Sequence, residues 1–246
     1  PELVFEIKSE EINPQEILVG ENYFILNKNL NKIWQRKKEE WITIDNNDSF
    51  LAEIFNNYLL ILSPPNKLIF LKNEESVQKE ISVPHPNISD ISSFGSNIYF
   101  LDQQNKEIIK TTFRENAEKL EVTTWLSPET KKPDDPKSMA IDGSIWILNE
   151  NNSIEKYYKG SFEREITISL FPDIDRISKL RTNPNTYYLF LLDKTEDRII
   201  VLNKKGELNR QLLFNEEELK DFHLAQDGKN IYVLTQNKVY KIPVEL

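Results

Sequence analysis

Six strongly apolar segments recur along the chain, and each ends in a leucine that is followed by a small or polar residue. Successive leucines of this kind are 36 to 47 residues apart. A repeat of about forty residues built from short strands is typical of β-propellers, in which each repeat forms one four-stranded blade. The repeat therefore predicts an all-β, six-bladed propeller. We call these residues the anchor leucines: Leu26, Leu62, Leu101, Leu148, Leu192 and Leu234.

Each anchor leucine is flanked by segments with the features of further strands. A turn rich in Asn, Asp, Pro and Lys follows it and leads into a β-branched or aromatic run, which is typical of a hairpin. A less regular apolar strand precedes it and is expected to line the central channel. Charged segments such as "REITIS" suit an outermost strand facing solvent. The innermost strands are expected at "EILVG", "FLAEIF", "DISSFG", "KSMAID", "ISKLRT" and "DFHLAQ".

The last repeat ends at "VYKIPVEL" with three strands, while an isolated strand from Glu2 to Lys8 has no repeat of its own. Pairing this strand onto the last blade supplies the missing fourth strand and leaves no open edge in the ring. We therefore expect the N-terminal strand to close the propeller, with residues 1–246 as a single domain. Because the chain begins with Pro rather than Met, we expect this domain to come from a longer protein.

The fifth repeat, "LLDKTEDRIIVLNKKGELNRQLL", resembles the NHL repeat. Asp193, Arg198, Ile199 and Gly206 match its pattern, whereas Glu196 stands where the family has Asn. The third repeat has the same turn, with Asp102, Asn105 and Ile108. The resemblance implies a six-bladed propeller that serves as a platform for protein or RNA, and it includes relatives that are extracytoplasmic lyases or sensor domains. We interpret Asp193, Arg198 and Gly206 as turn-forming residues.

Composition excludes several functional classes. With 31 Lys and Arg against 40 Asp and Glu, the net charge is -9, which disfavours nucleic acid as a partner. The absence of cysteine excludes disulfides, thiolate catalysis and cysteine-bound metals, and it leaves the compartment open. The apolar residues occur in short runs, so no membrane span is expected within the chain.

Catalytic motifs are sparse. The chain has two histidines; His85 lies in a proline-flanked connection, and His223 lies on an innermost strand near Asp221. A hydrogen-bonded structural role for His223 is favoured over that of a base or ligand. The expected starts of the innermost strands mix carboxylates with ammonium groups that oppose a cation. We therefore predict no metal and no cofactor. These starts are Gln15, Ser49, Asp90, Lys137, Lys179 and Asp221.

The longest interval between anchor leucines contains the connection "WLSPETKKPDDPKSMA", in which Trp125 and Pro133 lie. Its prolines keep it out of the sheets, and loops on a rigid scaffold commonly bind partners. An ordinary connection without a ligand is the alternative.

The sequence thus favours a non-catalytic module for protein–protein interaction or ligand sensing, with another protein or a small ligand as partner. A hydrolase or lyase with its site in the central channel is the alternative. The candidate binding residues are Asp90, Lys137, Lys179, Arg181, Asp221 and His223 at the channel mouth, and Trp125 and Pro133 on the loop face.

Overall fold

The computed structural model describes residues 1–7, 13–37, 40–43, 50–63, 67–72, 75–81, 88–170, 174–214 and 217–244. Two residues considered in the sequence, Ser49 and His85, lie outside these ranges.

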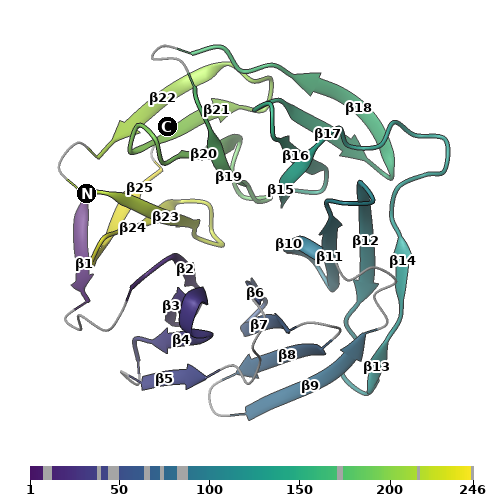
Figure 1. Cartoon of the computed structure of the whole chain (residues 1–246), viewed down its shortest axis with the longest axis horizontal. Helices are drawn as coiled ribbons and strands as arrows, with labels where there is room; N and C mark the ends of the chain where they lie inside the picture. Colours follow the sequence, from purple (N-terminus) through teal and green to yellow (C-terminus); the bar gives the residue numbers. More distant parts are fainter. Residues whose placement is uncertain are drawn as a thin grey trace.

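The strands form six sheets arranged in a ring, with one innermost strand of each sheet beside the central axis (Figure 1). The predicted six-bladed propeller is therefore confirmed. Blade 1 contains β2 (Glu16–Val19), β3 (Tyr23–Asn27), β4 (Lys32–Gln35) and β5 (Glu40–Thr43). Blade 2 contains β6 (Leu51–Phe55), β7 (Tyr58–Ser63), β8 (Lys67–Lys72) and β9 (Glu75–Ile81). Blade 3 contains β10 (Ile88–Phe94), β11 (Asn97–Asp102), β12 (Glu107–Thr112) and β14 (Val122–Thr124).

The second half of the chain repeats the arrangement. Blade 4 contains β15 (Pro136–Ile141), β16 (Ile145–Asn149), β17 (Ile154–Tyr158) and β18 (Ser161–Ile166). Blade 5 contains β19 (Ile177–Arg181), β20 (Tyr188–Asp193), β21 (Arg198–Asn203) and β22 (Leu208–Leu213). Blade 6 contains β23 (Leu219–Leu224), β24 (Asn230–Thr235) and β25 (Lys238–Pro243), and β1 (Glu2–Glu6) is its fourth strand.

The ring closes through the N-terminal strand, as predicted. β1 pairs antiparallel with β25, and Phe5 and Ile7 are buried between blades 6 and 1. Main-chain hydrogen bonds therefore tie the first strand to the last blade.

Blade 2 has a fifth strand that the sequence did not predict. The expected outer strand of blade 3, "EVTTWL", contains β14, which pairs with β12, whereas β13 (Lys119–Leu120) just before it pairs in parallel with β9 of blade 2. Leu120 is buried in the core between these two blades. This short strand therefore joins blades 2 and 3 at their outer edge.

The residue after each anchor leucine is buried, and in blades 1, 3 and 5 its side chain accepts hydrogen bonds from the turn that it begins. Asp102 accepts a hydrogen bond from the Asn105 amide at 2.9 Å, and Asn27 accepts one from Leu30 at 3.1 Å. Such side-chain acceptors satisfy amides that a tight turn leaves without a strand partner. All six of these residues are at most 5% exposed: Asn27, Ser63, Asp102, Asn149, Asp193 and Thr235.

Asp193 and Arg198 do more than form a turn. The Arg198 Nε donates to Asp193 at 2.7 Å and its Nη1 to Gln211 at 2.8 Å, and both members of the ion pair are fully buried. The pair thus connects three strands of blade 5. Gly206 lies in a turn, as predicted, with a backbone φ of 94°.

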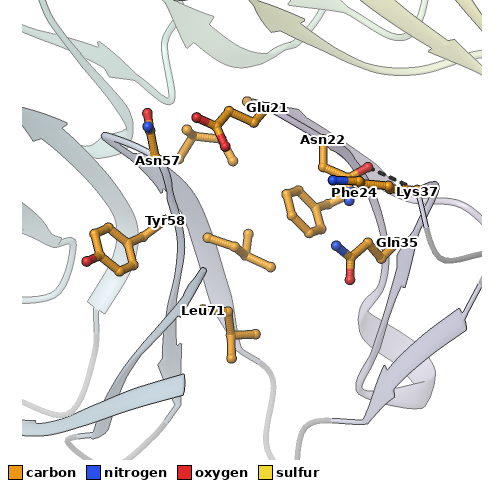
Figure 2. A pocket seen from close by; sticks show the side chains of 11 residues that line it. Glu21, Asn22, Phe24, Gln35, Lys37, Asn57, Tyr58 and Leu71 are labelled. Carbon is orange, nitrogen blue, oxygen red and sulfur yellow. Dashed lines mark hydrogen bonds between the residues drawn. The ribbon is translucent and has the colours of Figure 1, made fainter. Parts of the chain in front are cut away.

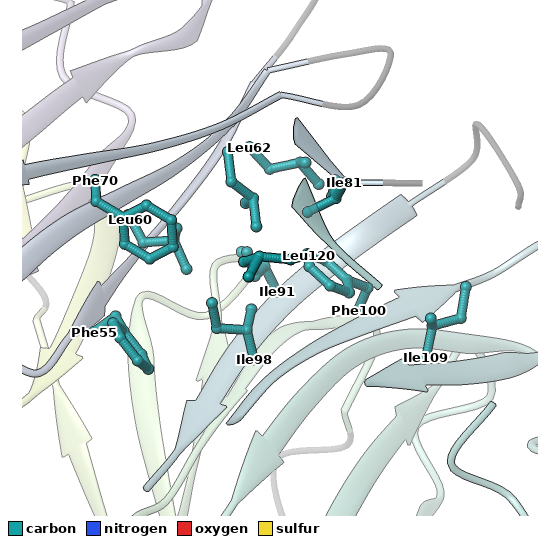
Figure 3. Close-up of a cluster of buried hydrophobic side chains, with 11 residues drawn as sticks. Phe55, Leu60, Leu62, Phe70, Ile81, Ile91, Ile98, Phe100, Ile109 and Leu120 are labelled. Carbon is teal, nitrogen blue, oxygen red and sulfur yellow. The ribbon is translucent and has the colours of Figure 1, made fainter. Parts of the chain in front are cut away.

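Among the described residues, buried hydrophobic side chains form six clusters, one between each pair of neighbouring blades. Figure 3 shows the cluster in which Phe55 and Phe70 of blade 2 meet Ile91 and Phe100 of blade 3. Since strand side chains alternate between the two faces of each blade, every blade contributes to two clusters. The ring is therefore stabilised by packing all the way around, and the innermost strands are fixed in position.

Candidate functional site

The register of the innermost strands defines the channel lining. In the six blades, the residues opposite the anchor leucines form a set that we call the first ring. The residues two positions further along form the second ring. The first ring consists of Glu16, Leu51, Asp90, Ser138, Lys179 and Asp221. The second ring consists of Leu18, Glu53, Ser92, Ala140, Arg181 and His223.

A register shift precedes the first ring in blades 3 to 6, and in blade 4 it explains why the expected residue is not in the ring. In blade 4 the shift lies between Pro136 and Ser138, so Lys137 is the bulged residue and Ser138 is opposite the anchor leucine. The Lys137 ammonium instead contacts Glu150 at 3.4 Å. In blade 1, Glu16 and not Gln15 belongs to the ring, and the Gln15 side chain accepts from the Lys28 amide at 2.6 Å.

The first-ring side chains hold neighbouring blades together. Asp221 of blade 6 accepts a hydrogen bond from the Ile17 amide of blade 1 at 3.0 Å. Asp90 of blade 3 accepts from the Met139 amide of blade 4 at 2.8 Å. The Ser138 hydroxyl accepts from the Leu180 amide of blade 5 at 3.2 Å. These bonds satisfy buried main-chain amides, so the polar character of the first ring has a structural cause.

Two carboxylates of the first ring are held in ion pairs with ammonium groups. Lys179 donates to both carboxylate oxygens of Asp221 at 2.8 Å, in a pair whose side chains are 15% and 1% exposed. Burial raises the pKa of Glu16, but the ammonium groups of Lys179 and Lys28 lower it further, to about 2. The Lys28 ammonium lies 2.7 Å from the Glu16 carboxylate. Lys179 is thus paired with Asp221, and Lys28 is paired with Glu16.

The second ring contains a looser ion pair across the axis. Arg181 of blade 5 and Glu53 of blade 2, from opposite sides of the ring, approach to 3.7 Å between Nη1 and Oε2, and their side chains are 11% and 13% exposed. The Nε of Arg181 is buried without a hydrogen-bond partner. Burial raises the pKa of Glu53, Arg181 opposes this shift and Asp90 adds to it, so the net direction is upward.

His223 lies beside this pair. Burial, reinforced by the positive charges of Arg181 and Lys179, lowers its pKa to about 3, although a hydrogen bond to the Val19 carbonyl acts the other way. The imidazole is therefore neutral at physiological pH, and its Nδ1 has no hydrogen-bond partner. The predicted structural role of His223 accounts for the bond to Val19 but not for the unpartnered nitrogen.

A cavity of about 270 Å³ lies where the innermost strands end, and all of the second ring except Leu18, which is buried between blades 1 and 2, lines it. It is lined by blades 2 to 6 and bears one cation among the described residues, Arg181. Ile54, Phe94 and Leu224 supply part of its apolar wall. At its rim, the Gln226 amide donates to the Asn56 carbonyl at 3.1 Å and thereby joins blade 6 to blade 2. The cavity therefore combines charged groups with a lining of both apolar and uncharged polar side chains, the latter including Ser93, Thr182 and Asn183.

Four predicted channel residues, Lys179, Arg181, Asp221 and His223, lie close together, and Asp90 is coupled to Arg181. Sequence reasoning missed Glu16 and Glu53. The available signal for Glu53 was a single carboxylate within an otherwise apolar innermost strand.

The two predicted loop residues lie apart from the cavity. Trp125 is half-buried and packs edge-on against Tyr99, with 6.3 Å between ring centroids, and Pro133 is buried. The connection is also tied to blade 4, since Lys131 contacts the buried Glu155 carboxylate at 2.5 Å.

A second, smaller cavity lies between blades 1 and 2 (Figure 2), with Phe24 and Gln35 on one side and Tyr58 and Leu71 on the other. Its volume of about 50 Å³ has room for little more than water. Across the described ranges, no three His, Asp or Glu side chains are arranged to hold a metal ion. In the same part of the chain, no helix has the length and apolar character required to cross a membrane.

Fold and channel together define a six-bladed β-propeller with a polar cavity at one end of its axis. Among solved structures, the chain is similar to a streptogramin B lyase, with a TM-score of 0.63 and 17% identity over 96% of this chain and 81% of the other. It is also similar to virginiamycin B lyase from Staphylococcus aureus, with a TM-score of 0.61 and 12% identity over 98% of this chain and 88% of the other. At these identities the similarity shows the fold alone.

No protein-family model matches the chain, and no curated protein matches its sequence. The resemblance of blades 3 and 5 to NHL repeats therefore stays a prediction.

Proposed function

We propose that this propeller is a non-catalytic module that binds a small ligand in the cavity at the end of its channel. The observation that carries the proposal is the convergence of Glu53, Arg181 and His223 on one cavity with hydrogen-bonding capacity left over. Buried polar groups are normally paired, and pairs that are incomplete without a ligand are typical of binding sites. A rigid ring of blades holds the three side chains in place without a moving loop.

A lyase activity in the same cavity is the second candidate. It is favoured by the neutral imidazole of His223 beside the Glu53 carboxyl, whose pKa is raised, because elimination needs one group to remove a proton and another to return one. The structural similarity to streptogramin B and virginiamycin B lyases supports it as well. A pKa of about 3 makes His223 a weak base at neutral pH, and for this reason we prefer binding without catalysis.

The test is a screen of small-molecule fragments by ligand-observed NMR, followed by a variant that fills the cavity. Ser93 lines the cavity, so Ser93→Phe should abolish binding. Ser96→Phe is the matched control, because Ser96 lies exposed in the next turn and outside the cavity. Binding that survives Ser93→Phe, or a screen without binders, would refute the proposal. Mass spectrometry of the bound compounds after incubation distinguishes binding from turnover.

A partner surface on the connection from Trp125 to Asp135 is a separate proposal. What supports it is the exposure of Glu129, Lys132 and Asp135 in that connection. Charge reversal at Lys132 and Asp135 should weaken capture of the native partner if this face binds protein.

A further inference from the structure

We propose that the ligand of the channel cavity is a small monocarboxylate with an apolar body, whose carboxylate binds Arg181 in place of Glu53. This inference rests on the proposed binding function and adds the chemical class of the ligand. It follows from the charge of the cavity, the geometry of the Arg181–Glu53 pair and the character of the walls.

The charge of the cavity sets the charge of the ligand. Arg181 is the one cation among the described residues that line it, since His223 is neutral. Lys179 does not line the cavity and is bound to Asp221 at 2.8 Å. A dianionic phosphate would need more positive charge than this cavity offers, whereas one guanidinium matches one carboxylate. The planar fork of arginine also suits the two oxygens of a carboxylate.

The guanidinium is available for such a ligand. Charge-assisted N–H to carboxylate bonds are about 2.7–2.9 Å long. The separation of 3.7 Å between Arg181 and Glu53 exceeds this range, and the Arg181 Nε has no hydrogen-bond partner. In the same channel, the Lys179–Asp221 pair is at contact distance. Arg181 therefore forms a weaker pair with Glu53 than Lys179 forms with Asp221.

Glu53 can leave the pair by taking up a proton. Its carboxylate faces Arg181, Asp90 and Lys179, and burial raises its pKa. Arg181 in turn faces Glu53, Asp90, Asp221 and Glu16. When a ligand carboxylate binds the Arg181 guanidinium, Glu53 loses the positively charged group that stabilises its ionised form most, and it has a new negative charge beside it. Its ionised form is then disfavoured further. Ligand binding is thus coupled to proton uptake by the Glu53 carboxylate.

The walls and size of the cavity describe the rest of the ligand. Ile54, Phe94, Ile141 and Leu224 offer apolar surface above the charged base. A volume of about 270 Å³ equals about nine water molecules at about 30 Å³ each. A short aliphatic or single-ring acid fits these dimensions, and benzoate is a suitable probe.

The experiment is isothermal titration calorimetry of the full chain with benzoate and with its neutral isostere benzamide. Benzoate should bind on the order of tenfold or more tightly than benzamide, and Arg181→Gln should remove this preference. Arg176→Gln is the matched control, because Arg176 is 71% exposed and outside the cavity. In buffers of different ionisation enthalpy, binding of benzoate should show net proton uptake at a pH where Glu53 is ionised. Glu53→Gln should abolish this uptake.

Equal affinity for the two probes, or a benzoate preference that survives Arg181→Gln, would overturn the inference. So would fragments that bind in the cavity when benzoate does not. In all three cases the proposed binding function stands, whereas a cavity that binds nothing refutes both. If Arg181→Gln fails to fold, the double variant Glu53→Gln/Arg181→Gln removes both charges together and tests the same preference.

Discussion

His223 should make the folded protein sensitive to mild acid. Its pKa is lowered from 6.5 in the unfolded chain to about 3 in the folded protein. Between these two values the unfolded chain binds a proton that the folded protein does not, so stability falls as pH falls. The contribution is fully present above about pH 6.5 and is lost progressively toward pH 3. Between pH 7 and pH 5 this one group should cost about 2 kcal/mol of unfolding free energy.

The perturbation is His223→Gln, which keeps a polar side chain without titrating. The measurement is urea-induced unfolding at pH 7, 6 and 5, with the slope of unfolding free energy against pH compared between the two proteins. Glu16, whose pKa falls from 4.5 to about 2, also loses its contribution as pH falls, but only below about pH 4.5. The pKa of Glu53 is raised, so its contribution to the pH dependence of stability has the opposite sign, and Glu53 is present in both proteins.

The variant should therefore lose about 2 kcal/mol less than the parent protein between pH 7 and pH 5. His85→Gln is the matched control, since His85 is the other of the two histidines in the chain. Identical slopes in the parent protein and in His223→Gln would refute the reasoning that His223 is buried in its neutral form.

Three further predictions concern the fold. Deletion of residues 1–7 opens the ring and removes the buried side chains of Phe5 and Ile7, which should lower the melting temperature in calorimetry by about 10 °C or more. Arg198→Met leaves its buried carboxylate partner unpaired and should cost about 3–5 kcal/mol in denaturant unfolding; an unchanged midpoint would contradict this. Gly206→Ala adds a methyl group against Ile166 at φ 94° and should destabilise more than Gly95→Ala, whose φ is also positive but which meets nothing within 4 Å.

The blade count, the order of strands and the ring closure were predictable because their signals are local. Apolar strands, turn residues and the spacing of the anchor leucines each report on a few neighbouring positions. The strand from Glu2 was recognised because the last repeat lacked a partner for its edge. By contrast, β13 pairs with a blade other than the one expected from chain order, and nothing in the two residues Lys119 and Leu120 indicates this.

The register of the channel was less predictable. A shift of one residue changes which side chains face the lining, and a bulge introduces that shift without a distinctive sequence. For this reason Lys137 was expected where Ser138 lies. In blade 1 there is no bulge, and Gln15 was expected where Glu16 lies because the start of the strand was placed one residue too early. The two rings also differ in whether their side chains bond to a neighbouring blade or reach across the axis. This difference depends on distances between blades, which no single segment of the sequence encodes.

This difference explains why the second ring, and not the first, is the better candidate for function. In the first ring, Asp90 and Asp221 each accept a main-chain hydrogen bond from the next blade, so a ligand there would compete with bonds that hold the propeller together. In the second ring, Arg181 and Glu53 reach across the axis and meet at 3.7 Å, which is too far for a hydrogen bond. A ligand that draws Arg181 away from Glu53 breaks no bond between neighbouring blades. The propeller can therefore bind and release such a ligand while its ring remains intact.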